Sequence, residues 1–256
     1  MEYLMQGFGV SISFGGVQAV KDVDFEVRDG EIFGIIGPNG AGKTTLLNGI
    51  SGLVPLSGGE IHFRGKRISG VKKPHQITRL GIGRTFQVTR PFEGLTVREN
   101  VAVGAVFGRP RGGRKADVHE VVEAAMRFVG NADKRDALVP DLPVAQRKRV
   151  ELARALAIEP KLLLLDEVMA GLNQKEIEVV MDMVRRIRER GTTVILIEHI
   201  MKVVMGLCDR IMVLNYGERL CCDEPDVVCR NDDVICAYLG QRFTQKRRNG
   251  GATSGA

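Results

Sequence analysis

The segment 37–44 has the residue types and spacing that hold the phosphate chain of a nucleotide. It reads Gly-Pro-Asn-Gly-Ala-Gly-Lys-Thr and meets the pattern G-x-x-x-x-G-K-[ST] at every specified position. The apolar run 32–36 comes directly before it and predicts the buried strand that this motif follows. Backbone N–H groups of such a loop surround phosphate oxygens, and the positive end of the next helix faces the same anion. We expect Lys43 to contact the β- and γ-phosphates and the Thr44 hydroxyl to bind Mg²⁺.

Acidic and polar residues follow two further apolar runs. Asp166 and Glu167 come after the run 162–165, and His199 lies just beyond the run 192–197. Both runs predict buried parallel strands, whose carboxyl ends form the site in an open α/β sheet. Asp166 is expected to hold Mg²⁺ directly or through water, and Glu167 to orient or polarise an attacking water. His199 would reach the γ-phosphate.

Gln87 ends the segment Arg-Thr-Phe-Gln and offers a neutral amide that can contact both a metal ion and a water molecule. Each of these signals has a simpler explanation when taken alone. An Asp-Glu pair after a strand is more often the first turn of a helix, and a single histidine is more often structural. Their common order behind a phosphate loop favours roles in nucleotide chemistry for all of them.

The rest of the chain falls into regions of different pattern. Residues 8–36 alternate apolar and polar side chains and predict an antiparallel sheet that leads into the phosphate loop, and 44–51 predicts the following helix. Short strands and turns are expected over 53–70 and a helical insert over 96–157, within which 108–115 has loop composition. No internal repeat is present. The pattern predicts an α/β protein.

Composition excludes several classes of protein. The chain has 256 residues, of which 44% are hydrophobic and 27% charged, as in soluble globular proteins. No apolar run approaches the roughly 18 residues of a membrane span, and the first residues lack the pattern of a secretory signal. We therefore expect a protein that neither crosses a membrane nor leaves the cytosol by itself.

Cysteine spacing and charge favour neither a metal centre nor nucleic-acid binding. The five cysteines lie in the last fifth of the chain without a C-x-x-C pair, which predicts reduced, mostly structural thiols. The net charge of +6 is spread widely, and aromatic residues make up only 5%. This pattern lacks the aromatic platform of single-strand binders, so a solvated basic surface that faces anionic lipid is the better interpretation.

With these motifs, the sequence closely resembles the ATP-binding-cassette (ABC) family of transporter ATPases over about residues 4–240. The matching motifs are the phosphate loop 37–45, the Gln87 loop, the acidic strand end at 166–167, Ala-Gly-Leu-Asn at the D-loop position 170–173, and His199 at the switch position. The resemblance implies an α/β P-loop NTPase core of RecA type with an antiparallel β subdomain and an inserted α-helical subdomain.

The resemblance also implies how the chain is divided. One cassette domain would span 4–240, with the nucleotide-binding core and β subdomain in 4–87 and 158–240 and the helical subdomain in 88–157. Residues 241–256 are polar and small, and we expect them to form a disordered basic tail.

Site roles follow from the resemblance, with ATP and Mg²⁺ as the implied ligands. Phe14 resembles the aromatic that stacks on adenine, with Val20 beneath the ring. The implied catalytic residues are Lys43, Gln87, Glu167 and His199, and the implied metal ligands are Thr44, Gln87 and Asp166. The implied nucleotide contacts are Phe14, Val20, Gly37, Pro38, Asn39, Gly40, Ala41, Gly42, Lys43, Thr44 and Thr45.

In this family two cassettes enclose two ATP molecules, and each site pairs one chain's phosphate loop with the other chain's signature loop. The signature position departs from Leu-Ser-Gly-Gly-Gln, because the chain has Leu142, Pro143, Val144, Ala145 and Gln146. Proline removes a hydroxyl and a backbone donor, and the next two residues add Cβ atoms where glycine allows close approach to a phosphate.

This departure leads to a hypothesis of an asymmetric heterodimer, in which a second ATPase with a normal signature completes this chain's site and the opposite site is slow. The alternative is that N–H groups at the start of the following helix still serve both sites. A second departure, Val168 in place of the usual proline after Asp-Glu, leaves the acids intact and predicts little effect.

Longer motifs narrow the resemblance to the ATPases of bacterial branched-chain amino-acid importers, and among them to the longer of the two. They are the segments 39–52, 83–87, 90–101, 197–205 and 237–240. Systems that carry urea or short amides share these motifs, and a lipopolysaccharide-export ATPase is a more distant alternative.

Three functions of different classes remain in view: a transport motor, a soluble cassette protein that acts on ribosomes or DNA, and a nucleotide sensor without turnover. The chain has one cassette and no long coiled-coil arm, and Glu167 and His199 are intact, so the motor is favoured. Its expected partners are a second ABC ATPase, two transmembrane permeases and, indirectly, a periplasmic solute-binding protein, with no nucleic acid. The expected location is the cytoplasmic face of the inner membrane.

Overall fold

The computed structural model describes residues 3–87, 91–108 and 117–239, and two sheets organise them. The four-stranded antiparallel sheet has the order β2-β1-β4-β5. Its strands are β1 (Tyr3–Phe14), β2 (Val17–Arg28), β4 (Gly58–Phe63) and β5 (Lys66–Arg67). In β1 and β2, buried apolar residues largely alternate with more exposed residues, which is the pattern of a sheet buried on one face.

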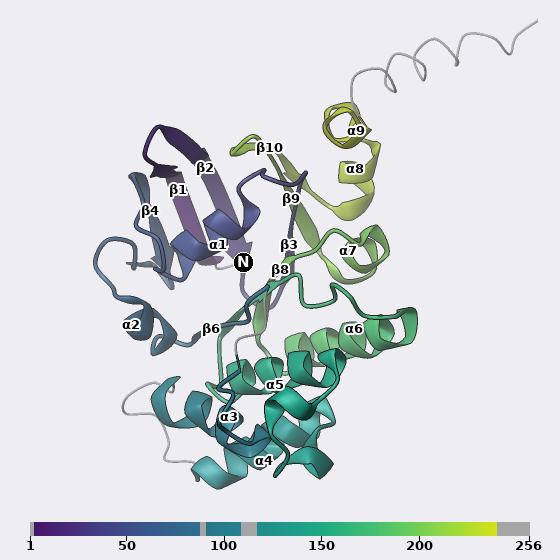
Figure 1. Ribbon diagram of the computed structural model, residues 1–256. Helices are drawn as coiled ribbons and strands as arrows, with labels where there is room; N and C mark the ends of the chain where they lie inside the picture. The colour runs from purple at the N-terminus through teal and green to yellow at the C-terminus, as the bar shows by residue number, and fades with distance from the viewer. Residues whose placement is uncertain (1–2, 88–90, 109–116, 240–256) are drawn as a thin grey trace, which may run out of the picture.

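The six-stranded sheet has the order β10-β9-β3-β8-β7-β6 and crosses the middle of the molecule (Figure 1). Its strands are β3 (Ile32–Ile36), β6 (Ile82–Arg84), β7 (Leu162–Asp166), β8 (Thr193–Ile197), β9 (Arg210–Asn215) and β10 (Glu218–Asp223). All neighbours pair in parallel except β9 and β10. The carboxyl ends of β3, β7 and β8 therefore meet at one edge.

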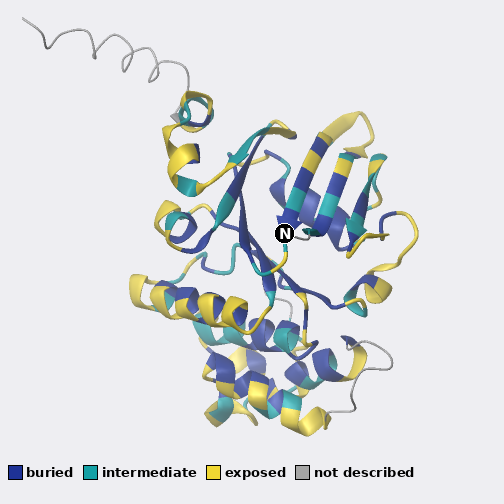
Figure 2. Ribbon diagram, turned by 180° about the vertical axis from the view of Figure 1, so that it is seen from behind, coloured by how far each residue is buried: buried dark blue, intermediate teal, exposed yellow. Residues whose placement is uncertain are grey.

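Helices cover this sheet on both faces. Those of the core are α1 (Lys43–Ile50), α2 (Pro74–Thr78), α6 (Gln174–Glu189), α7 (Met201–Leu207), α8 (Pro225–Arg230) and α9 (Asp232–Leu239). Every residue of β3, β7 and β8 is buried, as expected for parallel strands covered on both faces (Figure 2).

A group of helices lies at the end of the molecule away from the antiparallel sheet (Figure 1). It consists of α3 (Val97–Val103), the π-helix η1 (Gly104–Gly108), α4 (Val118–Val129), the 3₁₀ turns η2 (Ala132–Lys134) and η3 (Val139–Asp141), and α5 (Val144–Leu156). Local signals fix its ends: Thr96 and Glu99 form a capping box at α3, and Gly130 ends α4 in the left-handed conformation.

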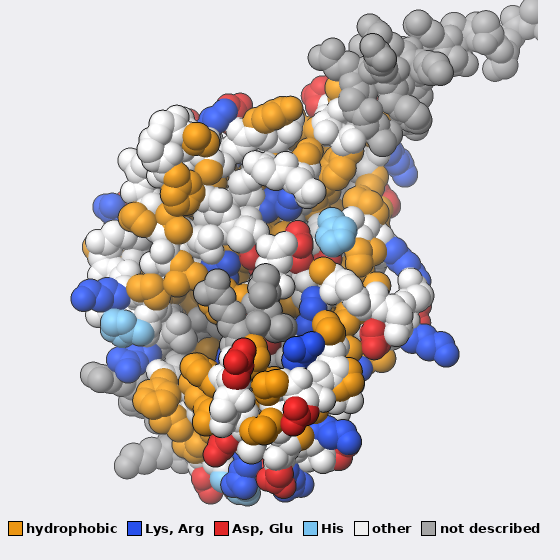
Figure 3. Space-filling view, in the orientation of Figure 1, with side chains coloured by type: hydrophobic (Ala, Val, Ile, Leu, Met, Phe, Trp, Pro, Cys, Tyr) orange, Lys and Arg blue, Asp and Glu red, His pale blue; other side chains and the backbone are white. Residues whose placement is uncertain are grey.

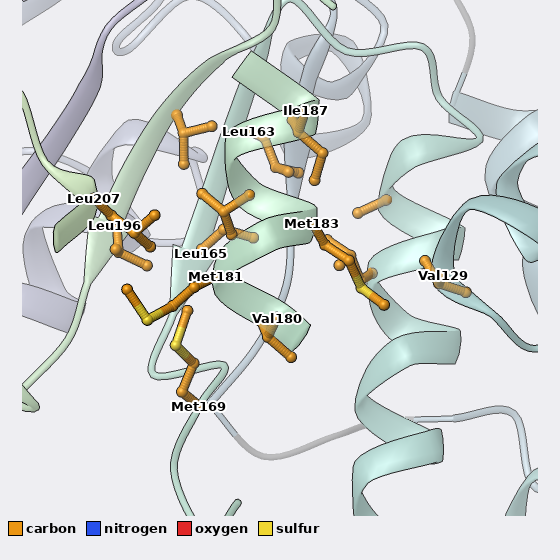
Figure 4. Close-up of a cluster of buried hydrophobic side chains, with 14 of the residues drawn as sticks. Val129, Leu163, Leu165, Met169, Val180, Met181, Met183, Ile187, Leu196 and Leu207 are labelled. Carbon is orange, nitrogen blue, oxygen red and sulfur yellow. The ribbon is translucent and has the colours of Figure 1, made fainter. Parts of the chain in front are cut away.

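Two hydrophobic clusters lie on opposite faces of the six-stranded sheet. Leu163 and Leu165 of β7 contact the cluster shared with α4, α5 and α6 (Figure 4), whereas Leu162 and Leu164 contact the cluster under α1 and the antiparallel sheet. The two-residue period of a strand causes this division. The apolar runs thus build a platform, packed on both faces, that fixes where each strand ends.

The predicted strands at 162–165 and 192–197, the helix after the phosphate loop and the helical insert are confirmed. The expected loop at 108–115 lies outside the described residues except for Gly108, and the tail 241–256 lies wholly outside them. Within the described part of the chain, no helix is both long and apolar enough to span a bilayer.

The cysteines carry free thiols in the described structure. Burial raises the pKa of the Cys208 thiol to about 12, which makes it an inert core group. Among the residues that the structure describes, no group of three or more His, Cys, Asp or Glu side chains forms a metal cluster of their own. On the face shown in Figure 3, acidic and basic side chains are interspersed, so the net positive charge is not gathered into one field there.

Candidate nucleotide site

The phosphate loop connects β3 to α1, and two of its positions accept only glycine. Gly37 and Gly42 have φ values of 150° and 97°. A Cβ at Gly37 would overlap the carbonyl oxygen of Leu214, and one at Gly42 would overlap that of Ala19. No side chain caps the start of α1, so this helix end and the loop amides form a concave anion site.

The Lys43 ammonium lies inside the loop that it serves. Its Nζ donates hydrogen bonds to the carbonyl oxygens of Gly37 at 2.7 Å and Pro38 at 2.9 Å, and the residue is only 8% exposed. Burial lowers the pKa of Lys43, while Glu167 and Asp166 raise it. A buried cation held by neutral carbonyls is electrostatically suited to an incoming phosphate.

Asp166, at the end of β7, is held from two sides. The Thr44 hydroxyl donates to Oδ1 at 3.3 Å, and Nη2 of Arg84 contacts Oδ2 at 3.3 Å. Nη1 of Arg84 donates to the Ser51 hydroxyl at 2.6 Å. Burial raises the pKa of Asp166, and the Arg84 charge and the Thr44 hydroxyl lower it. The hydroxyl and carboxylate oxygens that face each other here are hard ligands and fit Mg²⁺.

Glu167 and Gln87 meet across the strand ends. Nε2 of Gln87 donates to Oε2 of Glu167 at 2.7 Å. Glu167 has φ of 48°, an uncommon value for a residue with a side chain, and its amide donates to the Ile197 carbonyl at 3.0 Å. The turn after β7 is therefore fixed by the end of β8.

A cavity of about 510 Å³ brings most of the predicted residues together. It is lined by Ala19, Asn39, Gly40, Ala41, Gly42, Lys43, Thr44, Thr45, Gln87, Glu167 and His199. An adjoining cavity of about 290 Å³ is lined by Thr44, Gln87, Arg84 and Asp166 among others. The predicted catalytic and metal-binding residues thus all lie at one edge of the six-stranded sheet.

The predicted adenine contacts, Phe14 and Val20, are not among the described residues that line the larger cavity. Phe14 ends β1 and is 50% exposed. Val20 is fully buried and lies 3.4 Å from where a Gly42 Cβ would be. Between them Ala19 lines the cavity.

The signature segment lies elsewhere. Leu142 is buried, Pro143 is the N-cap of α5 without a side-chain hydrogen bond, and Val144 is 50% exposed. The Gln146 carbonyl accepts a hydrogen bond from Nδ2 of Asn131 at 3.0 Å. None of the five signature residues belongs to the described lining of the cavity that holds Lys43.

Sequence reasoning missed several residues around the site. Arg84 is a basic residue inside a short buried strand, which is a signal for a buried partner. Ala19 gave no signal because it contributes by position alone. Burial raises the pKa of the Tyr238 hydroxyl, and the backbone of Gly37 in the phosphate loop lowers it. Lys148 reaches the carbonyl oxygens of the turn after β7 from α5, a contact that no local pattern predicts.

Comparison with known proteins places this geometry in a family. The family model described as ABC transporter matches residues 20–170. The high-affinity branched-chain amino acid transport ATP-binding protein LivG of Salmonella typhimurium is 38% identical over 246 residues, covering 91% of this chain and 96% of the relative. The corresponding BraF of Pseudomonas aeruginosa is 36% identical over 253 residues, covering 93% and 98%.

Solved structures agree with the sequence relatives. MJ1267, an ATP-binding cassette of an ABC transporter, superposes with a TM-score of 0.84 at 27% identity and covers 94% of this chain and 100% of its own. Its ADP conformation gives 0.83 at 28% identity with the same coverage.

The chain belongs to the ABC transporter family as an ATP-binding cassette. It is an ATPase subunit of the kind that powers such transporters, and nucleotide is its ligand. The predicted fold class, the family and the enzyme class are thereby confirmed.

Proposed function

We propose that this chain is the motor of an importer for branched-chain or related amino acids. The observation that carries the proposal is the joining of Lys43, Gln87 and Glu167 around one cavity in a chain whose relatives LivG and BraF are named for that transport. The function of the relatives gives the solute class, and the geometry gives the chemistry.

Triphosphate binding falls to the loop and its lysine. Amides of the loop and of the start of α1 donate hydrogen bonds to the phosphate oxygens, and the Lys43 ammonium exchanges its contacts with the Gly37 and Pro38 carbonyls for the β- and γ-phosphates. The Phe14 ring stacks on adenine over Val20. Binding of the triphosphate therefore replaces hydrogen bonds that already hold Lys43 in place.

Thr44, Asp166 and Gln87 are the residues that would hold Mg²⁺. The fit rests on the Thr44 hydroxyl and the Asp166 carboxylate, which face each other at 3.3 Å, with Gln87 lining the same adjoining cavity. When bound there, Mg²⁺ neutralises charge on the β- and γ-phosphates. Arg84 keeps the other oxygen of Asp166 turned away from this position.

Hydrolysis falls to Glu167 with Gln87 and His199. A water oxygen bonds to the γ-phosphorus, the bond from phosphorus to the β–γ bridging oxygen breaks, and Glu167 accepts the proton of the water. Gln87 orients Glu167 through its 2.7 Å hydrogen bond, and His199 contacts the γ-phosphate from the end of β8. ADP and phosphate leave, and the site reopens.

The signature segment can act only on the nucleotide of a second cassette. The start of α5 is uncapped by any side chain, and Pro143 provides neither a hydroxyl nor an N–H. We therefore favour a heterodimer in which the partner's signature completes this chain's site and the opposite site is slow. The helix-start amides of Val144 and Ala145 are the basis of the alternative, in which both sites turn over.

A largely apolar groove of about 430 Å³ supports docking of this chain on one of the two expected permease subunits. It is lined by His75, Thr78, Arg84, Phe86, Phe92, Val103, Gly104, Phe107, Gly108, Arg154, Ala155 and Ile158. Its wall includes Phe86, the neighbour of Gln87, so a permease element seated there would contact the catalytic loop. The proposal puts the chain on the cytoplasmic face of the inner membrane, with a periplasmic solute-binding protein acting through the permeases.

The test is reconstitution with candidate permeases, a candidate sister ATPase and a candidate solute-binding protein. We expect co-purification, and ATPase activity in vesicles that rises several-fold with leucine-loaded binding protein and not with the unloaded protein. A Glu167→Gln version of the same complex is the matched control for contaminating ATPases. Activity that responds to urea or to lipopolysaccharide, and not to leucine, would reject the proposed solute class.

A further inference from the structure

Lys148 on α5 contacts the turn that carries the catalytic carboxylate. Its Nζ donates to the carbonyl oxygens of Glu167 at 3.3 Å, Val168 at 3.2 Å and Ala170 at 2.7 Å. An ammonium group has three N–H donors, so these carbonyls use its whole capacity. The contact joins α5 to the segment between β7 and α6.

The turn itself requires support. Glu167 has a positive φ, which is unfavourable for a residue with a Cβ and persists only where surrounding contacts impose it. The Met169 amide donates to Oε1 of Glu198 at 2.9 Å, and the Ala170 amide donates to the Glu167 carbonyl at 3.1 Å. Glu198, directly after β8, therefore holds one amide of the turn, and Lys148 holds three of its carbonyls from α5.

The same helix also contacts the Gln87 loop. Glu151, one turn after Lys148, is 6% exposed, and its Oε1 accepts a hydrogen bond from the Phe86 amide at 2.9 Å. Gln87 in turn donates to Glu167 at 2.7 Å. Two charged residues of α5 therefore hold the two loops whose side chains meet over the attacking-water position.

We propose that Lys148 is a positioning residue for ATP hydrolysis, holding the Glu167 turn against the helix whose start forms the signature segment. Lys148 lies three residues after Ala145, which is less than one helical turn. A second cassette's nucleotide seated at the start of α5 would therefore lie within one helical turn of Lys148, which contacts the Glu167 carbonyl. The proposal rests on the proposed role of Glu167 in hydrolysis.

The first test is hydrogen exchange of the nucleotide-free full chain, because it reports the contact without any turnover. In Lys148→Met we expect amides of 168–172 to exchange at least about tenfold faster, since the carbonyls of the turn lose their donors. Lys161→Met is the matched control, because Lys161 is exposed at the opposite end of β7. Its exchange over 168–172 should equal that of the wild type.

The second test is steady-state turnover in the reconstituted complex. Lys148→Met should lower kcat about 10- to 100-fold, since the carboxylate is displaced, while the Kd for ATP stays within about twofold. A loss confined to kcat separates positioning from a general weakening of the fold, which would also reduce binding.

Lys148→Gln guards against failure of the first variant to fold, since its amide keeps two N–H donors without the charge. It should show the same changes at smaller size. Wild-type exchange over 168–172, or wild-type kcat, in a folded Lys148 variant overturns the proposal. Failure of the proposed function is distinguishable, because it would appear as absent ATP turnover in the wild type, whereas the exchange measurement needs no nucleotide.

Discussion

The phosphate-loop site and the signature segment of the same chain differ in how many of their groups already have partners within the chain. Around the first, four polar side chains already have partners inside the molecule: Lys43 contacts loop carbonyls, Thr44 and Arg84 contact Asp166, and Gln87 contacts Glu167. The second is the bare start of α5, with Val144 half exposed. The residues for ATP hydrolysis are therefore already arranged in the single chain, whereas its signature segment can act only after a second cassette has bound.

Glu167→Gln should cause the largest fall in kcat, and it changes only the phosphate-loop site. The amide keeps the shape and the contact with Gln87 but no longer accepts the proton of the attacking water. We expect kcat in the assembled complex to fall about 10²- to 10⁴-fold, with ATP affinity retained. Turnover of the assembled complex, with calorimetric ATP binding by the same variant, checks both parts, and full ATPase activity would contradict the assigned role.

Arg84→Met tests how much the buried ion pair at the phosphate-loop site contributes to the stability of the fold. The side chains of Arg84 and Asp166 are 7% and 1% exposed, so the change leaves a buried carboxylate without its cation. We expect the free energy of unfolding to fall by about 3–5 kcal/mol in denaturant titrations. Arg127→Met, an exposed position on α4, is the control and should stay within about 0.5 kcal/mol of the wild type. An equally small change for Arg84→Met would show that the pair is dispensable.

Replacing residues 143–145 by Ser-Gly-Gly, the usual signature sequence, tests the signature segment. A regained charge-assisted hydrogen bond is worth about 1.5–3 kcal/mol, so turnover at the opposite site, measured with this chain's own site silenced by Glu167→Gln, should rise about tenfold or more if that site is slow. Val227→Gly is a matched control, because Val227 and Val144 are each 50% exposed near a helix start. Unchanged turnover would remove the asymmetry and favour the helix-start amides as sufficient donors.

The parts of the site that lie on one short segment were predictable, and those that join distant segments were not. The phosphate loop and the strand ends at Asp166 and Glu167 carry local patterns, because a buried strand and a glycine turn impose their own residue types. The salt bridge between Arg84 and Asp166 spans the pairing of β6 with β7, and the Lys148 contact spans α5 and the turn after β7. Such contacts depend on the tertiary arrangement, which leaves no period in the sequence.

The fold shows the same division. Alternation and apolar runs predicted the strands and the helical insert, yet the strand order β9-β3-β8-β7-β6 came only from the structure, since residues adjacent in the sheet are up to 177 apart along the chain. Phe14 was assigned by resemblance, and because it does not belong to the described lining of the cavity, that role stays a prediction.

Calorimetric titration of Mg²⁺-ATP into the Glu167→Gln chain, with and without Lys43→Ala, tests the central claim most directly. The account predicts binding at one site per chain and an affinity at least about 100-fold lower once the Lys43 ammonium is gone, because its charge-assisted hydrogen bonds to phosphate are lost. Equal affinity in the two proteins, or no nucleotide uptake by the well-folded chain that retains Lys43, would contradict it.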